Sequence, residues 1–284
     1  MAVRVVTDST ADIPQDLVKE LGISVVPLTV QFGDKSFLDR VEITPDQFFQ
    51  WLIESPQLPT TSQPSPGAFL DVYRGLLEAE HQVVSIHISD KLSGTLNSVR
   101  QAKEQLGDVP LEIIDSRQAA ISLGLVVIAA ARAVKDGASY EETQSVARQA
   151  LGQVQLFALL DTLEFLRKGG RIGKVRGFIG TLLHVRPIIT VTDGEVQSVI
   201  SVRSRDQGIR YMLTLAEERS PLIQAAVFHS TTPDEAEEVA DQLRPMVSDG
   251  NVIIGRIGPV IGTHVGPGAV GVVIQSEKSG ESES

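Results

Sequence analysis

The side chains of this sequence that could bind a ligand gather in four short polar stretches. One of them, Ser89–Ser98, follows the apolar run Val83–Ile88 and leads into apolar residues at three- and four-residue spacing, which predict a helix. Ser93 stands where the N-cap of that helix is expected, and Gly94 lets the backbone pass close to another group. Amide N–H groups, the positive end of a helix dipole and several hydroxyls would meet there, so the stretch predicts an anion site. The alternative is that Ser93 only caps its helix, since serine is among the commonest caps.

The other three stretches supply hydrogen-bond donors from distant parts of the chain. Thr61 and Ser62 lie in an extended loop stiffened by proline, and Arg171 lies between glycines in a basic loop. His264 lies in the glycine-rich loop Gly262–Gly268, where it can donate a hydrogen bond in either tautomer. Each also has a purely structural interpretation. In that case the hydroxyls serve a turn, Arg171 is a solvated charge, and His264 makes no ligand contact.

Signatures of catalysis and of cofactor binding are missing or incomplete in the sequence. Ser93 lacks the G-x-S-x-G context of a nucleophile elbow, and the five histidines do not stand at metal-ligand spacing. Gly266–Gly271 matches G-x-G-x-x-G, yet it leads into a strand and has no acidic residue about 20 positions further on. Gly170–Lys174 resembles a phosphate-binding loop only loosely, with Val175 in place of a magnesium-binding hydroxyl. We therefore expect no metal and no cofactor. The alternative function is a stand-alone phosphotransferase or serine hydrolase that uses Ser93.

The composition restricts the possible partners. The 284 residues include 25 Lys and Arg against 36 Asp and Glu, a formal net charge of -11, so nucleic acid and anionic membrane surfaces are poor partners. There is no cysteine, which excludes a disulfide scaffold, a thiolate nucleophile and zinc–sulfur sites. Met1–Val6 leads straight into a strand pattern, so no signal peptide is expected, and the longest apolar run, 121–131, has the length of a buried helix. These features predict a cytoplasmic protein without stable membrane insertion.

Residues 1–155 alternate predicted strands and helices, which is typical of a parallel sheet covered on both faces. Strands are expected at 3–6, 23–32, 83–88 and 111–114, and two of the helices start at the capping boxes 44–47 and 139–142. Polar residues follow three of these strands, at 8–9, at 89 and at 115–116. Because ligands of open α/β sheets bind beyond the carboxyl ends of the strands, we expect these polar clusters to share one edge.

The pattern changes near Gln155 and predicts a second domain. Asp193-Gly194 between two apolar segments predicts an antiparallel hairpin, and helices are expected at 205–219 and after Thr232. Residues 278–284 are polar and are expected to be disordered. The predicted fold is therefore α/β with two domains: 1–155 with a parallel sheet, 156–277 with a mixed sheet, and the tail 278–284.

Seven stretches of the sequence, in order along nearly the whole chain, resemble the DegV family. Any one of them is a weak signal, but seven in register are specific. They are Thr7–Ser9 with Ile13–Pro14, Thr61–Ser65, Leu92–Thr95, Asp115–Arg117, Leu163–Ile172, Arg186–Ile188 and His264–Gly268. Arg186 stands where the family usually has lysine, which keeps the charge.

The resemblance implies an α/β/α domain with a parallel sheet, an α/β domain with a mixed sheet, and a long-chain fatty acid such as palmitate, stearate or oleate bound between them. It implies that the carboxylate is held by the residues matching the family's headgroup positions, namely Thr61, Ser93 and His264, with Ser62, Gly94 and Arg171 nearby. It further implies that a separate ATP-dependent fatty acid kinase makes the acyl phosphate used in phospholipid metabolism. Arg203 resembles a basic position that docks this kinase, and the binding subunit does not catalyse alone.

The acyl chain would supply most of the affinity for such a ligand. Each buried CH₂ contributes ~0.8 kcal/mol, so about a dozen give roughly 10 kcal/mol before ordering costs. A charge-assisted hydrogen bond adds only ~1–3 kcal/mol. The polar cluster should therefore orient the carboxylate while an apolar tunnel in the second domain provides affinity. Candidates for the tunnel, each of which has ordinary core packing as its alternative, are Phe165, Ile172, Phe178, Ile179, Leu182, Leu183, Ile188 and Ile189.

Overall fold

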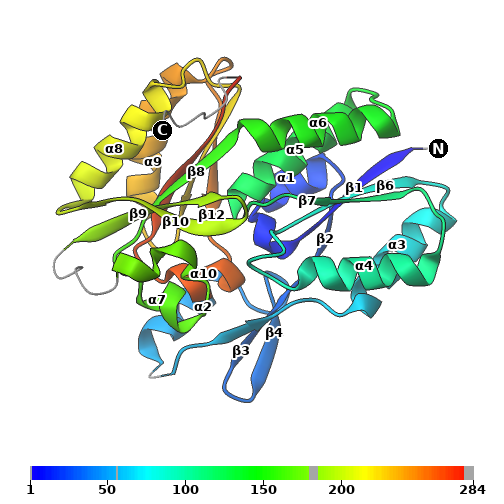
Figure 1. Ribbon diagram of the computed structural model, residues 1–284, viewed down its shortest axis with the longest axis horizontal. Coiled ribbons are helices and arrows are strands. Elements are labelled where there is room, and N and C mark those ends of the chain that lie inside the picture. The colour runs from blue at the N-terminus through cyan, green and yellow to red at the C-terminus, as the bar shows by residue number, and fades with distance from the viewer. Residues whose placement is uncertain (1, 56, 179–184, 278–284) are drawn as a thin grey trace.

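A parallel four-stranded sheet organises the first half of the chain (Figure 1). The computed structural model describes residues 2–55, 57–178 and 185–277. The sheet has the strand order β2-β1-β6-β7, with all neighbours parallel. Its strands are β1 (Val3–Asp8), β2 (Ser24–Val26), β6 (Gln82–His87) and β7 (Leu111–Asp115). The predicted α/β fold with a parallel sheet is confirmed.

Helices cover both faces of the parallel sheet because its side chains alternate between them. Val6 and Val83 face one side and pack with Phe69, whereas Val5 and Val84 belong to the core on the other side. The helices of the first side are α3 (Pro66–Glu78) and α4 (Thr95–Leu106). Those of the second side are α5 (Ile121–Lys135) and α6 (Tyr140–Gln153), and the short α1 (Gln15–Glu20) follows β1.

The second half is built on a mixed six-stranded sheet with the order β10-β9-β8-β13-β11-β12. Only β11 and β12 are parallel, and the Asp193-Gly194 turn joins β9 and β10 as the predicted hairpin. Its strands are β8 (Val154–Leu159), β9 (Arg186–Thr192), β10 (Glu195–Val202), β11 (Gln224–His229), β12 (Val252–Arg256) and β13 (Val270–Gln275). Its outer face is covered by α8 (Arg205–Glu217) and α9 (Pro233–Leu243).

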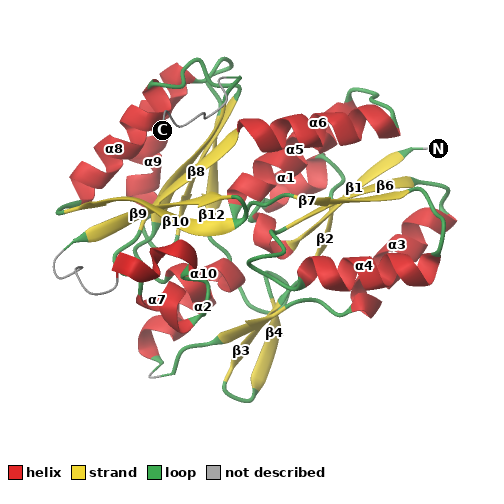
Figure 2. Ribbon diagram, in the orientation of Figure 1, coloured by secondary structure: helices red, strands yellow, loops and turns green. Residues whose placement is uncertain are grey.

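A small antiparallel sheet, β4-β3-β5, closes one end of the space between the two large sheets (Figure 2). The strand expected at 23–32 is in fact two strands of different sheets, because Pro27 lacks the N–H that a continuous ladder needs. The elements here are β3 (Thr29–Phe32), β4 (Lys35–Leu38), β5 (Thr60–Ser62), α2 (Pro45–Glu54), α7 (Glu164–Lys168) and α10 (Pro259–Val265). Among them, α10 contacts α2, α7, β3 and β5.

Helix α5 lies in a middle layer, between the parallel sheet and the mixed sheet (Figure 1). It contacts β1 and β6 on one side and β8, β11 and β13 on the other. This explains why 121–131 is apolar almost throughout, since a helix between two sheets has no solvent-facing stripe. One continuous apolar core therefore crosses residue 155, and the division into domains at that residue stays a prediction.

Three local expectations are corrected. Helix α4 begins at Thr95 with Gly94 as its N-cap, so Ser93 precedes the cap. The loop predicted around Thr61 is the strand β5, and the loop predicted around His264 is the helix α10, in which Gly262 packs closely against Phe48 and Phe49. The predicted capping boxes at Thr44 and Ser139 are confirmed. Within the described ranges, no helix combines the length and the apolar content needed to span a bilayer.

Candidate functional site

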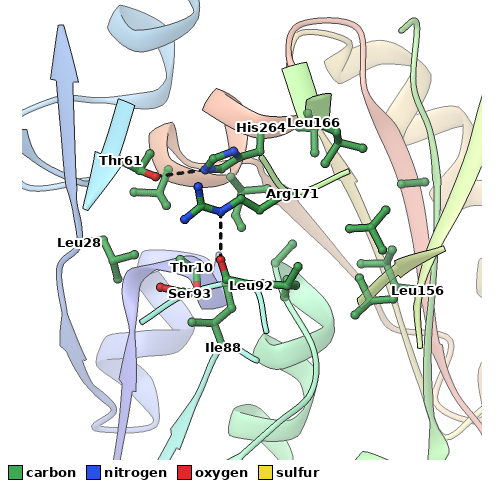
Figure 3. A pocket seen from close by; sticks show the side chains of 18 of the residues that line it. Thr10, Leu28, Thr61, Ile88, Leu92, Ser93, Leu156, Leu166, Arg171 and His264 are labelled. Atoms are coloured by element: carbon green, nitrogen blue, oxygen red, sulfur yellow. Dashed lines mark hydrogen bonds between the residues drawn. The ribbon is translucent and has the colours of Figure 1, made fainter. Parts of the chain in front are cut away.

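An apolar cavity of about 100 Å³ lies where the middle layer continues beyond the start of α5. Both large sheets and the small sheet contribute to its wall (Figure 3). The lining residues that sequence reasoning missed are mainly aliphatic, and the principal ones are Thr10, Leu28, Ile88, Leu92, Leu156, Ala158, Leu166, Val191, Val196, Phe228, Val260, Ile261 and Val265. The arrangement provides space for an apolar group, and the cavity reaches the surface at the exposed residues Ser62 and Gln63.

The parallel-sheet wall comes from the segments that follow the carboxyl ends of the strands. Thr10 follows β1, Ile88 follows β6, and Ala119 and Ala120 lie between β7 and α5. Because these strands are parallel neighbours, their ends meet, as the sequence predicts. For example, the Ile88 amide donates to the Asp8 carboxylate at 3.2 Å.

The mixed-sheet wall comes from alternate residues on the strand face that looks towards α5. Leu156 and Ala158 of β8, and Ile189 and Val191 of β9, share this face because strand side chains alternate. In the sequence these residues are marked only by the alternation of apolar side chains along a strand. Residues that pack in the core show the same alternation, so the pattern does not separate the two groups.

Thr61 and His264 meet at one end of the cavity (Figure 3). The Thr61 hydroxyl lies 3.1 Å from Nε2 of His264, which is in the last turn of α10. Nδ1 of the same ring is buried and has no hydrogen-bond partner among the described residues. A methyl group on Gly169 would lie 2.2 Å from this Nδ1, so glycine is the residue that leaves room for the ring.

Arg171 lies between the Thr61–His264 pair and the segment of Leu92 and Ser93 (Figure 3). Its Nε donates to the Leu92 carbonyl at 3.1 Å, and its Nη1 donates to the Gly169 carbonyl at 2.7 Å. Ser93 lies 2.9 Å from the Thr95 hydroxyl and accepts from the Thr95 amide at 3.3 Å. These contacts fix the guanidinium and the serine at the wall of one cavity.

The electrostatics of this end favour an anion. Burial and, to a smaller extent, the nearby Arg171 charge together lower the pKa of His264 to about 4. The imidazole is therefore neutral at pH 7 and acts as a hydrogen-bond donor or acceptor. Among the described residues that line the cavity, Arg171 is thus the one cation. A carboxylate placed here would gain one charge partner and up to two neutral donors, namely Ser93 and one member of the Thr61–His264 pair.

The remaining predicted residues are distributed as follows. Ser62 and Ile189 line the cavity, whereas Gly94 lies beside it, where a Cβ would come within 2.5 Å of the Gln63 side chain. Three tunnel candidates do not line the cavity. Phe165 packs against Gly266, and Ile172 belongs to the central apolar core. Ile188 belongs to the apolar cluster on the outer face of the mixed sheet. Ile179, Leu182 and Leu183 lie outside the described residues, as does the side chain of Phe178. Arg203 is exposed just before α8.

A second polar group of residues lies under the cavity wall and forms a buried chain. Tyr73 lies 2.7 Å from Ser85, Ser85 lies 2.7 Å from Nε2 of His87, and His87 Nδ1 lies 2.9 Å from the Asp8 carboxylate. Asp8 also accepts from the amide and the hydroxyl of Thr10. The hydrogen bonds run from Ser85 to His87 to Asp8, as they do in the catalytic triad of a serine hydrolase. All three side chains are fully buried, however, and Ser85 does not line the cavity.

The fold and the site define a class of protein: an α/β protein with two large sheets and an apolar cavity that has polar groups in its wall. Over residues 2–277 the sequence matches the family described as "Uncharacterised protein, DegV family". A DegV domain-containing protein of Caldanaerobacter subterraneus subsp. tengcongensis is 34% identical over 278 residues, which cover 97% of this chain and 99% of that protein. The chain belongs to the DegV family.

Solved structures of related proteins share the fold. A DegV family protein from Thermus thermophilus, described for its fatty acid binding, matches with a TM-score of 0.90 at 34% identity and covers 97% of this chain and 100% of that one. A stearic acid-binding protein from Eubacterium ventriosum matches with a TM-score of 0.85 at 29% identity and covers 97% and 98%. These structures confirm the mixed α/β fold.

Proposed function

We propose that this protein binds one long-chain fatty acid, with the tail in the apolar cavity and the carboxylate at the end formed by Thr61, Ser93, Arg171 and His264. The observation that carries the proposal is the combination of a mainly aliphatic wall with one cation and several hydroxyls among the described lining residues. The fatty acids named for the related structures support the same ligand class. Palmitate, stearate and oleate are the natural test ligands.

The geometry suggests how the carboxylate would be held. Arg171 supplies the charge, since burying an unpaired carboxylate is costly. Neutral His264 can donate a hydrogen bond to the carboxylate without adding a second positive charge. Thr61 and His264 are hydrogen-bonded to each other, so in the other tautomer the Thr61 hydroxyl donates to the carboxylate instead. Ser93 would approach from the start of α4. The tail would follow the strand residues Leu156 and Ile189.

The family resemblance supports the second part of the proposal, a role in presenting the fatty acid to a separate ATP-dependent kinase in the cytoplasm. In this scheme the partner kinase phosphorylates the carboxylate, and Arg203 is a docking residue. The domains proposed at 1–155 and 156–277 would together form the binding site, since both contribute lining residues. No observation favours Ser93 as a stand-alone nucleophile, because its hydrogen-bond partners among the described residues are the Thr95 amide and hydroxyl rather than a base.

The ligand class can be tested by mass spectrometry of an organic extract of the purified protein, with its native mass measured in parallel. We expect a long-chain fatty acid at one equivalent, either co-purified or taken up from added palmitate or oleate. A protein that is empty and also fails to take up either fatty acid would contradict the proposal. ATP titration of the isolated protein then addresses the alternative, because clear ATP binding would favour a stand-alone phosphotransferase.

The carboxylate assignment can be tested with the double variant Thr61→Ala/Ser93→Ala. We expect its Kd for oleate to rise at least about thirtyfold, because two hydrogen bonds to a charged group, worth ~1–3 kcal/mol each, are lost. Acyl-phosphate formation with a fatty acid kinase should fall in parallel, while the unfolding midpoint stays within about 2 °C of the wild type. The matched control is Thr60→Ala/Ser36→Ala, which removes two exposed hydroxyls of the small sheet. Full kinase turnover with the first variant would show that the assignment is wrong.

A further inference from the structure

A second cavity, of about 290 Å³, lies behind the turn that follows β1. The turn Ser9–Ala11 separates the two cavities, because Thr10 lines the fatty acid cavity and Ser9 and Ala11 line the second one. The second cavity reaches the surface at the exposed residues Gln15 and Val41. It is therefore a separate site that a small solute can enter.

Two buried carboxylates face this second cavity with three unpartnered oxygens. Asp39 is 1% exposed, and neither of its carboxylate oxygens has a partner within hydrogen-bonding distance and angle among the described residues, although the Ser9 hydroxyl is close enough to lower its pKa. Asp12 is 2% exposed; its Oδ1 accepts from Arg40 at 2.8 Å and from the Gly258 amide at 2.9 Å, while its Oδ2 has no partner within the same residues. Buried acceptors are almost always paired in native proteins, so these three oxygens require a partner.

The charges near this cavity do not balance. Nη2 of Arg40 pairs with Asp12 and also donates to the Arg256 carbonyl, whereas its Nε has no hydrogen-bond partner among the described residues. Asp39 is left without an ion pair among the described residues, and burial raises its pKa to about 7. The neighbouring carboxylates of Asp12 and Asp8 act in the same direction, against the Ser9 hydroxyl and Arg40. Water would satisfy the hydrogen bonds of Asp39 but not its charge.

We propose that the cavity between Asp12 and Asp39 binds a primary ammonium group carried on a small alkyl chain. A primary ammonium has three N–H donors, which matches the three unpartnered oxygens, and its charge neutralises Asp39. Part of the remaining wall is apolar and suits the alkyl part, and it includes Val18, Ile23, Val25, Pro27 and Val41. Polar side chains of Asp8, Ser9, Gln15 and Arg40 form the rest of the wall. A metal ion is less suited, since the described residues contain no group of three or more His, Cys, Asp or Glu placed to hold one.

The proposal can be tested with n-butylammonium as the probe, by isothermal titration calorimetry at pH 8 with the full chain. We expect saturable one-site binding, weakened at least tenfold in Asp39→Asn and unchanged in Asp34→Asn, a matched control in the exposed turn before β4. Tetramethylammonium, which has the charge but no N–H donor, should bind at least tenfold more weakly than n-butylammonium. The uptake of oleate should be the same in Asp39→Asn as in the wild type, which separates this site from the fatty acid site.

Either of two results would overturn the proposal. One is the absence of saturable n-butylammonium binding to the wild type, and the other is equal binding by wild type and Asp39→Asn. If Asp39→Asn does not fold, carboxyl ¹³C NMR of the wild type decides. Bound n-butylammonium should lower the apparent pKa of the Asp39 carboxyl, whereas an unchanged titration curve would contradict the site.

Discussion

Two groups of hydroxyls around a histidine lie within this fold, and they differ in how completely their hydrogen bonds are made. In the buried chain, His87 has a partner at both ring nitrogens and Asp8 accepts from several donors. At the cavity, His264 has a partner at one ring nitrogen and none at the other among the described residues. In the first arrangement both ring nitrogens are paired, whereas the second leaves one ring nitrogen able to make a further hydrogen bond.

The largest effect on stability is expected from Asp8→Ala in the buried chain. The substitution leaves the donors of Thr10, His87 and Ile88 without an acceptor in the core, so the free energy of unfolding should fall by about 3–5 kcal/mol. Urea denaturation measures this loss, and the exposed Asp108→Ala is the control, with an expected change within about 0.5 kcal/mol.

The same variant tests the comparison itself. If the chain is structural, folded Asp8→Ala should bind oleate within about threefold of the wild type. A large loss of affinity with little loss of stability would show instead that the buried chain belongs to the binding site.

A smaller effect, confined to binding, is expected from Gly169→Ala. The residue has φ -75° and ψ -5°, which alanine adopts without strain, but its Cβ would collide with Nδ1 of His264. We expect a ten- to thirtyfold rise in the Kd for oleate, about 1.4–2 kcal/mol, because the displaced ring also disturbs Thr61. Fluorescence competition with a labelled fatty acid measures the change.

The control for this variant is Gly152→Ala in α6, where an added Cβ meets nothing within 4 Å. It should leave the Kd unchanged and stabilise the helix slightly, by roughly 0.5–1 kcal/mol. Equal Kd values for Gly169→Ala and the wild type would mean that the orientation of His264 does not matter for binding.

The smallest effect is a pH dependence caused by His264. Its folded pKa of about 4 lies below the ordinary value of 6.5, so the unfolded chain binds more protons between these values. The contribution of neutral His264 to the free energy of unfolding is therefore complete above pH 6.5, and it is lost as the pH falls towards 4. When the pH is lowered from 7.5 to 6, the free energy of unfolding should fall by about 1 kcal/mol more in the wild type than in His264→Gln, as measured by urea denaturation at both pH values. Parallel losses in both proteins would show that the proton binds elsewhere, for instance at His229.

The sequence supports the prediction of most elements of the large sheets, because their periodicity and caps are local signals. It is misleading at α10, since the seven residues Pro259–Val265 include a glycine and β-branched side chains and have weak helix propensity. Packing of Gly262 on Phe48 and Phe49 favours the helix there. That contact depends on residues more than 200 positions apart in the sequence, which no local pattern reveals.

In the candidate site, too, some residues could be found from the sequence and others could not. Thr61, Ser93, Arg171 and His264 stand out by residue type and lie together at the cavity. The aliphatic wall could not be separated from the core beforehand, because Ile189 lines the cavity while its neighbour Ile188 packs on the opposite face. Likewise, Asp12 and Asp39 are ordinary loop residues until the fold buries them.

Helix α5 packs against both large sheets within one apolar core, so neither sheet can unfold without exposing the other. The described chain should therefore melt in a single cooperative transition. A fatty acid bound at 100 times its Kd would then protect the whole molecule by about 2.7 kcal/mol, which lowers the unfolded fraction about a hundredfold. Proteases act mainly on unfolded chains, so lipid supply would set the lifetime of the protein as well as its occupancy.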